Sequence, residues 1–167
     1  MGLTAVTLYY FDADAQVKYF VNETGSAWIR RQVDETDANN RFLHGIATVE
    51  ISQIEVSAAL SILQRLNRIG RQLRDRAFRD YLNLVNGRFR LLVVDATLVS
   101  EASALPQKYP LKALDALHLA AATRLYRELA ARQLTLTCVS SDRQLLAAAR
   151  AEGLLAENPH DHIQSGE

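Results

Sequence analysis

Short apolar runs alternate with longer segments of helical periodicity along this chain. The apolar runs have the length of buried strands, and we predict strands at residues 6–11, 42–47, 89–94 and 134–140, with a short edge strand at 154–157. Between them the pattern predicts helices at residues 13–22, from 26 onward, and at 51–69, 71–85, 97–105, 111–130 and 142–153. This alternation is typical of an α/β domain with a mainly parallel sheet.

The composition fits one globular domain. The chain has 167 residues, of which 49% are hydrophobic, and its 19 basic and 19 acidic side chains cancel, so it lacks the strongly basic balance of many nucleic-acid binders. Its single cysteine, Cys138, has no disulfide partner within the chain, which suits a reducing compartment. No basic leader and no apolar run of ~20 residues is present. We therefore expect a cytoplasmic protein that does not enter the membrane.

The domain organisation is predicted from the same pattern. We expect a single domain over residues 1–157, with a helical arm at about 51–86, and a flexible tail at 158–167. The stretch from residue 65 to 90 contains eight arginines against two aspartates. Such a stretch is explained equally well by a solvated helix face, or by contacts to RNA phosphates or to an acidic partner segment.

Two acidic residues interrupt helices that otherwise read as apolar. Glu55 lies on or beside the apolar face predicted from Ile54 and Ile62, and an unpaired buried carboxylate is costly, so we expect it to have a partner such as an arginine or a metal ion. Asp115 and His118 are the only polar residues in a run of nine. A first-turn acid and a satisfied core histidine are the plain structural explanations of these two side chains.

Two further acids follow predicted strands. Asp12 comes after the first strand and by itself reads as a helix N-cap. Asp142 comes after the strand at 134–140, where Ser141 and Gln144 read as a capping box and Asp142 as a first-turn acid.

All four acids are nevertheless placed to converge at one end of the sheet. Ligands of parallel α/β sheets bind beyond the carboxyl ends of the strands, where these loops and helix starts meet. Clustered carboxylates repel one another unless a cation neutralises them, and an oxygen-only ligand set favours Mg²⁺ or Mn²⁺. Such a site suits phosphodiester hydrolysis. Two other classes stay open, a non-catalytic RNA-binding or scaffolding module and a phosphatase-like hydrolase with a nucleophilic aspartate.

Four stretches carry a specific resemblance. "YYFDADAQVKYFVNETGS", "SQIEVSAAL", "LDALHLAAA" and "VSSDRQLLAAARAEGL" resemble, in order and spacing, the four acidic motifs of PIN-domain nucleases, especially VapC-type toxins. The resemblance implies a three-layer α/β/α fold with a central mainly parallel sheet, Mg²⁺ or Mn²⁺ at a carboxylate cluster, and endonucleolytic cleavage of RNA. It also implies a cognate antitoxin and a homodimer. The catalytic acids it implies are Asp12, Glu55, Asp115 and Asp142, with Asp12, Asp115 and Asp142 as metal ligands.

Accessory residues follow from the same motifs. Ser140 fills the position of the hydroxyl that the family commonly has two residues before its fourth acid. Asp14 replaces a serine or threonine of the first motif, and we expect it to cap the following helix as the hydroxyl would, rather than to join the carboxylate cluster. Lys18 and Arg143 follow the first and fourth motifs closely enough to reach a phosphate.

Overall fold

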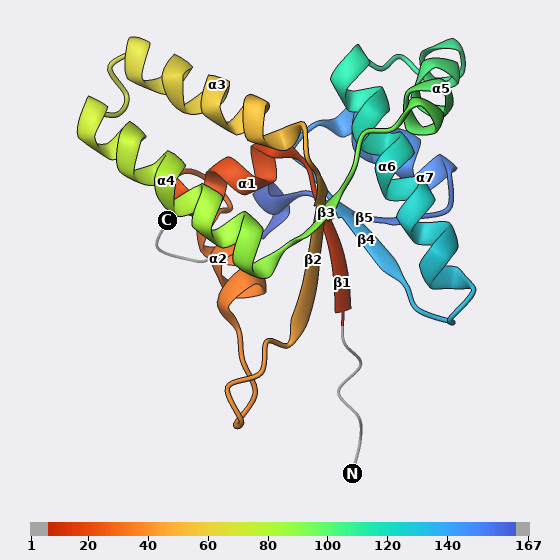
Figure 1. The fold of residues 1–167 in the computed structure, drawn as a ribbon, viewed down its shortest axis with the longest axis horizontal. Helices are drawn as coiled ribbons and strands as arrows, with labels where there is room; N and C mark the ends of the chain where they lie inside the picture. Colours follow the sequence, from red (N-terminus) through yellow and green to blue (C-terminus); the bar gives the residue numbers. More distant parts are fainter. Residues whose placement is uncertain (1–6, 163–167) are drawn as a thin grey trace.

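A parallel five-stranded sheet forms the centre of the protein and lies between two helical layers (Figure 1). The computed structural model describes residues 7–162. The strand order is β3-β2-β1-β4-β5, and every neighbouring pair is parallel. The strands are β1 (Thr7–Phe11), β2 (His44–Val49), β3 (Arg90–Leu92), β4 (Leu136–Val139) and β5 (Leu155–Glu157).

The helices cover both faces of this sheet. In Figure 1, α1 to α4 lie on one side and α5 to α7 on the other. Their bounds are α1 (Ala13–Phe20), α2 (Ser26–Asp34), α3 (Ser52–Arg65), α4 (Arg71–Arg88), α5 (Ala96–Ala104), α6 (Ala113–Ala130) and α7 (Arg143–Ala151), with short 3-10 helices η1 (Leu105–Gln107) and η2 (Pro159–Asp161). The predicted three-layer α/β/α fold is confirmed. No helix within residues 7–162 is long and apolar enough to cross a membrane.

Strand β1 joins the two helical layers because it lies in the middle of the sheet and is covered on both faces. Tyr10 and Phe11 are both fully buried, and successive side chains of a strand point to opposite faces. Tyr10 accordingly packs in the core beneath α5, α6 and α7, whereas Phe11 packs with residues of α2. The residue after Phe11 is therefore held at the carboxyl edge between the two layers.

Helix α3 differs from its predicted form in length and in the face it buries. It ends at Arg65 rather than near residue 69, and Asn67 adopts a positive φ of 56°, which a continuing helix does not allow. Its buried residues are Ser52, Val56 and Leu60, while Ile54 and Ile62 are 68% and 47% exposed. The prediction that Ile54 and Ile62 mark the buried face is wrong, because the helix turns the face that carries Val56 and Leu60 to the core instead.

Part of the expected tail packs against the domain. Asn158 caps η2 by accepting a hydrogen bond from the backbone N–H of His160, and Pro159 is buried. The ring of His162 stacks on Trp28 with 4.3 Å between ring centroids. Residues 158–162 therefore form a folded segment against α2, whereas 163–167 of the predicted tail lie outside the described residues.

Candidate active site at the carboxyl edge of the sheet

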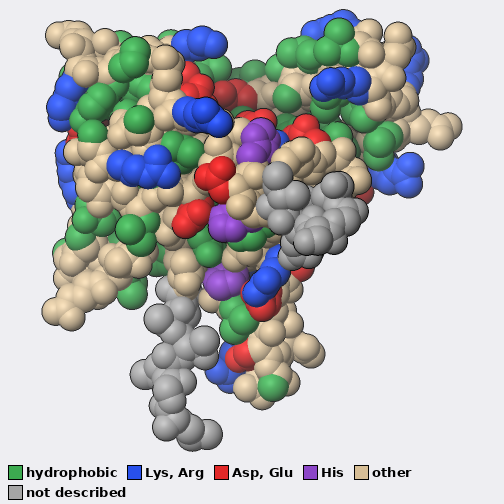
Figure 2. Space-filling view, turned by 180° about the vertical axis from the view of Figure 1, so that it is seen from behind, with side chains coloured by type: hydrophobic (Ala, Val, Ile, Leu, Met, Phe, Trp, Pro, Cys, Tyr) green, Lys and Arg blue, Asp and Glu red, His purple; other side chains and the backbone are tan. Residues whose placement is uncertain are grey.

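The strand order reverses direction between β1 and β4, and the candidate site lies beyond the carboxyl ends of these two strands. A crevice at such a reversal is where open α/β sheets bind their ligands. The backbone N–H of Asp12 donates to the carbonyl of Val139 over 3.2 Å, which ties the end of β1 to the end of β4. Figure 2 shows acidic side chains gathered in a hollow between two lobes of the molecule.

Asp12 is the buried acid of this edge. It is 6% exposed and caps α1, with its Oδ1 accepting from the backbone N–H of Ala15 over 2.8 Å, so the N-cap interpretation is confirmed. Burial is the main cause that raises the pKa of Asp12 to about 6; the charge of Asp14 contributes to the rise, while His118 and hydrogen bonds from Ser140 and Ala15 oppose it. Losing its proton near neutral pH thus has a cost that a bound cation would offset.

A buried amide network holds the loop that carries Asp12. Gln16 donates to the carbonyls of Phe11 and Asp12 over 3.3 and 3.0 Å and to the hydroxyl of Thr48 over 2.8 Å. The Thr48 hydroxyl in turn donates to the Phe11 carbonyl and meets that of Ser52, each over 2.8 Å. The sequence analysis missed this network. A glutamine four residues after Asp12, on the buried face of a short helix, was the available signal.

Ser140 connects Asp12 to the fourth motif. Its hydroxyl is fully buried, forms a hydrogen bond with Asp12 that lowers the pKa of that carboxyl group, and accepts from the backbone N–H of Asp142 over 2.9 Å. Asp142 itself is exposed and caps α7, accepting from the backbone N–H groups of Gln144 and Leu145 over 2.7 and 3.0 Å. The predicted capping box starting at Ser141 is therefore wrong, because α7 begins one residue later than that box requires.

Asp115 lies in the first turn of α6, as expected for an acid that interacts favourably with the helix dipole. Burial raises the pKa of Asp115, and the charge of Asp142 raises it next, so these two carboxylates are close enough to repel each other. A backbone hydrogen bond from Lys112 and the neighbouring His118 oppose the shift. Two motifs far apart in sequence thus meet at the edge.

Glu55 has a histidine as its partner rather than an arginine. Its Oε2 lies 2.8 Å from Nε2 of His118, and the other ring nitrogen of His118 lies 3.0 Å from the Tyr10 hydroxyl. His118 is 2% exposed and Tyr10 is fully buried. The interpretation of His118 as a satisfied core histidine is confirmed, and it also brings α3 and α6 together at the site. The sequence pattern does not indicate that Tyr10 contacts His118.

The charge of Asp14 is balanced locally. Asp14 is half-exposed and lies 3.7 Å from the ammonium of Lys18, which is 3% exposed and also pairs with Glu23 over 2.9 Å. The expected capping role of Asp14 is wrong, because Asp12 already holds that position. Lys18 is engaged by two carboxylates, and Arg143 is an exposed residue at the start of α7.

The donor set fits a hydrated hard cation. Within residues 7–162 no ion pair joins Asp12, Asp115 or Asp142 to a lysine or arginine, and no group of three or more Asp, Glu, His and Cys side chains has the geometry to hold one metal ion. Mg²⁺ characteristically keeps several waters and binds through one or two carboxylates. Asp115 and Asp142 repel each other and have no lysine or arginine partner among the described residues, which is compatible with that mode of binding. The described residues contain no preformed group of three or more ligands for a single ion.

Comparisons with known proteins bear on the family and the fold. A profile of the PIN domain matches residues 9–151, a span that includes all four acids. A search among curated protein sequences gave no significant match.

Solved structures share the fold at low sequence identity. PAE2754 from Pyrobaculum aerophilum is 18% identical, with a TM-score of 0.58 over 93% of this chain and 92% of that one. The sarcin-ricin loop cleaving toxin VapC20 of Mycobacterium tuberculosis is 15% identical, with a TM-score of 0.56 over 88% and 96% of the two chains. A toxin-antitoxin complex from Klebsiella pneumoniae contains a chain that is 15% identical, with a TM-score of 0.53 over 90% and 97%.

Proposed function

The chain belongs to the PIN-domain family, and we propose that it is a Mg²⁺- or Mn²⁺-dependent endoribonuclease that hydrolyses phosphodiester bonds in RNA. The observation that carries this proposal is that Asp12 and Asp115 have raised pKa values at the reversal of the sheet, and that within residues 7–162 neither they nor Asp142 pair with a lysine or arginine. Acids placed in this way destabilise one another unless a cation is bound. Their placement is therefore explained by function rather than by stability.

Each acid would have a distinct role. Asp12, Asp115 and Asp142 would hold the ion, and Ser140 keeps the first and last of these in register through its hydroxyl. The bound ion would polarise a phosphoryl oxygen and lower the pKa of an attacking water. The carboxylate of Glu55 has one oxygen engaged by His118 and accepts no other hydrogen bond within residues 7–162, so its Oε1 can accept the proton of that water.

The partners proposed are an RNA substrate, a second copy of the chain and a cognate antitoxin in the cytoplasm. Support for the antitoxin comes from the structural likeness to a chain crystallised in a toxin-antitoxin complex. Support for RNA comes from the likeness to a toxin that cleaves the sarcin-ricin loop.

RNA cleavage by the purified protein tests the proposal. We expect single-stranded RNA to be cut in the presence of Mn²⁺ or Mg²⁺, cleavage to stop in EDTA, and cleavage to return when the metal is restored. Cleavage that continues in EDTA would refute the metal-dependent assignment.

Asp142→Asn and Asp95→Asn form a matched pair for this test. Both aspartates follow parallel strands, both are exposed and both cap a helix, since Asp95 accepts from the backbone N–H of Leu98 over 2.6 Å. Asparagine is also a good N-cap, so each variant keeps its helix start. Asp95 differs because it pairs with Arg124 over 3.0 Å. We expect only Asp142→Asn to lose cleavage, and equal losses would count against the site.

The alternative function is a catalytically weakened PIN-fold protein that binds RNA or acts as a scaffold. Its main sequence support was Asp14, whose additional charge the structure shows paired with Lys18. RNA binding without metal-dependent cleavage, in a folded protein supplied with Mn²⁺, would favour this alternative.

A further inference from the structure

A buried hydrogen-bond chain runs from the central strand to the carboxylate of Glu55. We propose that Tyr10 and His118 are positioning residues, which fix the Glu55 carboxylate at the candidate active site. The distances along the chain are 3.0 Å from the Tyr10 hydroxyl to Nδ1 of His118 and 2.8 Å from Nε2 of His118 to Oε2 of Glu55. The inference rests on the proposed function, because it assigns these residues to the same reaction.

The direction of this chain follows from what each group can donate. An ionised carboxylate only accepts hydrogen bonds, so Nε2 of His118 must carry the proton that Glu55 receives. In the neutral ring Nδ1 is then an acceptor, and the Tyr10 O–H donates to it. A tyrosine hydroxyl has a usual pKa of ~10, so it keeps its proton at neutral pH. If both nitrogens of His118 were protonated, Nδ1 could not accept a hydrogen bond. The hydroxyl proton of the fully buried Tyr10 would then lose this acceptor.

The three side chains come from three different layers of the fold. Tyr10 lies in β1, His118 in α6 on one face of the sheet, and Glu55 in α3 on the other face (Figure 1). The hydrogen bond from His118 to Glu55 therefore joins the two helical layers across the carboxyl edge. Packing alone does not require this link, because the side chain of Glu55 is 18% exposed and can reach water.

The link also sets the place of Glu55 relative to another acid. Asp115 precedes His118 by three residues, and residues at this spacing share one face of a helix. His118 lies near the carboxyl groups of both Asp115 and Asp12. Holding Glu55 against His118 thus holds it beside both, with one carboxylate oxygen left for a water or substrate.

Tyr10→Phe tests the chain with a single-atom deletion, and Tyr81→Phe is its matched control. Tyr81 is also fully buried, but its hydroxyl has no hydrogen-bond partner within the described residues. We expect kcat for RNA cleavage to fall about tenfold in Tyr10→Phe, with KM little changed, because one hydrogen bond to the positioning histidine is lost. Tyr81→Phe should leave kcat unchanged. Equal kcat values for the two variants would overturn the proposal.

The tautomer of His118 gives a readout that does not depend on cleavage. Nitrogen-15 NMR of the imidazole in the metal-free protein should show the proton on Nε2 in the wild type, and the resonance of the unprotonated Nδ1 should shift in Tyr10→Phe because this nitrogen loses its hydrogen-bond donor. A wild-type ring protonated on Nδ1, or an Nδ1 resonance unaffected by Tyr10→Phe, would overturn the proposal. If the wild type cleaves no RNA in Mn²⁺, the proposed function fails, and the NMR result alone then decides whether the chain holds Glu55.

Substitution of His118 separates positioning from packing. Glutamine can still donate to Glu55 whereas leucine cannot, so we expect His118→Gln to retain several-fold more kcat than His118→Leu. Thermal unfolding of both variants checks that they are folded. Equal kcat for two folded variants would show that the histidine acts only by packing; if leucine prevents folding, the Tyr10→Phe comparison decides the question.

Discussion

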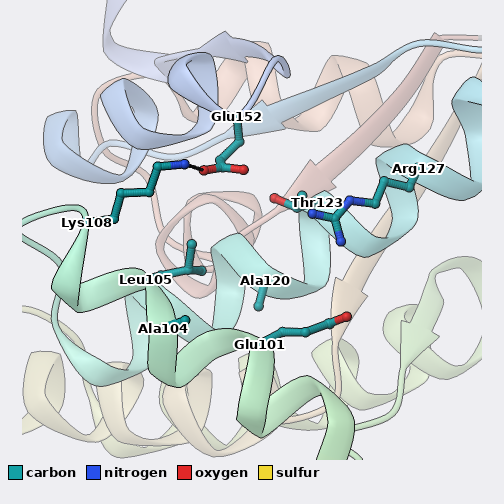
Figure 3. A pocket seen from close by; sticks show the side chains of 8 residues that line it. All are labelled: Glu101, Ala104, Leu105, Lys108, Ala120, Thr123, Arg127 and Glu152. Atoms are coloured by element: carbon teal, nitrogen blue, oxygen red, sulfur yellow. Dashed lines mark hydrogen bonds and ion pairs between the residues drawn. The ribbon is translucent and has the colours of Figure 1, made fainter.

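Two regions of the molecule contain several acidic side chains, and pKa values among these acids are shifted in opposite directions. At the carboxyl edge of the sheet, Asp12 and Asp115 have pKa values raised by burial and by neighbouring acids. On the outer face of α6, next to α5 and η1, lies a cavity of about 270 Å³, which we call the lateral pocket; it is lined in part by Glu101, Lys108 and Glu152 (Figure 3).

The acidic side chains in and beside the lateral pocket each form an ion pair with a lysine or arginine; they are Glu101, Glu152 and Asp95. Glu152 accepts from Lys108 over 2.7 Å and from the Tyr109 hydroxyl over 2.6 Å, and these bonds lower its pKa. Glu101 and the nearby Asp95 both meet Arg124 over 3.0 Å, and Arg124 lowers the pKa of Asp95. The lateral pocket thus uses its acids to hold α5, α6 and α7 together. Within residues 7–162, Asp12 and Asp115 at the carboxyl edge have no lysine or arginine in an ion pair, as the proposed cation site would require.

The largest expected difference between the two regions is in catalysis. We expect Asp12→Asn to reduce RNA cleavage about a hundredfold or more, because it removes a ligand charge from the proposed ion. Glu101→Gln in the lateral pocket should leave cleavage unchanged. Initial rates at saturating Mn²⁺ measure both. Full activity in Asp12→Asn would assign the cleavage to a contaminating nuclease.

The next difference is in stability and its dependence on pH. The folded-state pKa of Asp12 is about 6 against an ordinary value of 3.8, so the folded protein binds this proton more tightly than the unfolded chain does. The contribution of Asp12 to the free energy of unfolding is therefore fully present below its unfolded-state pKa of 3.8. It is lost as the pH rises from 3.8 through the folded-state pKa of about 6. In EDTA at pH 7, Asp12→Asn should raise the free energy of unfolding by up to roughly 3 kcal/mol.

Urea unfolding at several pH values measures this effect. The difference between Asp12→Asn and the wild type should shrink toward pH 4 and should also shrink when Mn²⁺ is added, since only the wild type gains from the ion. Asp95→Asn should lower stability instead, because the pKa of Asp95 is depressed by its partner. A destabilised Asp12→Asn protein in EDTA would contradict the comparison.

A smaller effect on stability is expected when Arg124, the basic side chain beside the lateral pocket, is replaced. Arg124→Met leaves Asp95 and Glu101 without their partner, and partly exposed ion pairs of this kind contribute about 1 kcal/mol or less. We expect a small, salt-dependent loss of the free energy of unfolding and no change in cleavage. A large loss of cleavage with retained stability would mean that the lateral pocket takes part in the reaction.

Sequence alone predicted the parts of this molecule that depend on periodicity. The parallel sheet follows from apolar runs of strand length, and the meeting of Asp115 with Asp142 follows from where strands end in such a sheet. Contacts between side chains distant in sequence could not be predicted in this way. The chain from Tyr10 through His118 to Glu55 depends on how α3 and α6 face each other across the edge, and Tyr10 reads as one more apolar position of a strand.

Local capping was predicted less well, because neighbouring polar residues compete for the same role. Asp14 was expected to cap α1 and Ser141 to start a capping box, whereas Asp12 and Asp142 accept these hydrogen bonds. The register of a helix start depends on where the preceding strand ends, and a one-residue shift moves the cap to another side chain.

The smallest expected effect concerns Asp14, an acid of the carboxyl edge that lies next to a lysine. Asp14 raises the pKa of Asp12, but its side chain is 49% exposed and lies 3.7 Å from Lys18, so much of its field is screened or neutralised. Asp14→Ser, which places a hydroxyl there, should change Mn²⁺ affinity by less than about threefold and the free energy of unfolding by about 0.5 kcal/mol or less. Lys18 keeps its bond to Glu23 in this variant and stays buried with a partner. Calorimetric titration of Mn²⁺ into both proteins measures the change. A tenfold or greater loss of affinity would show that Asp14 acts with Asp12 at the ion, and would move Asp14 from the surface into the proposed site.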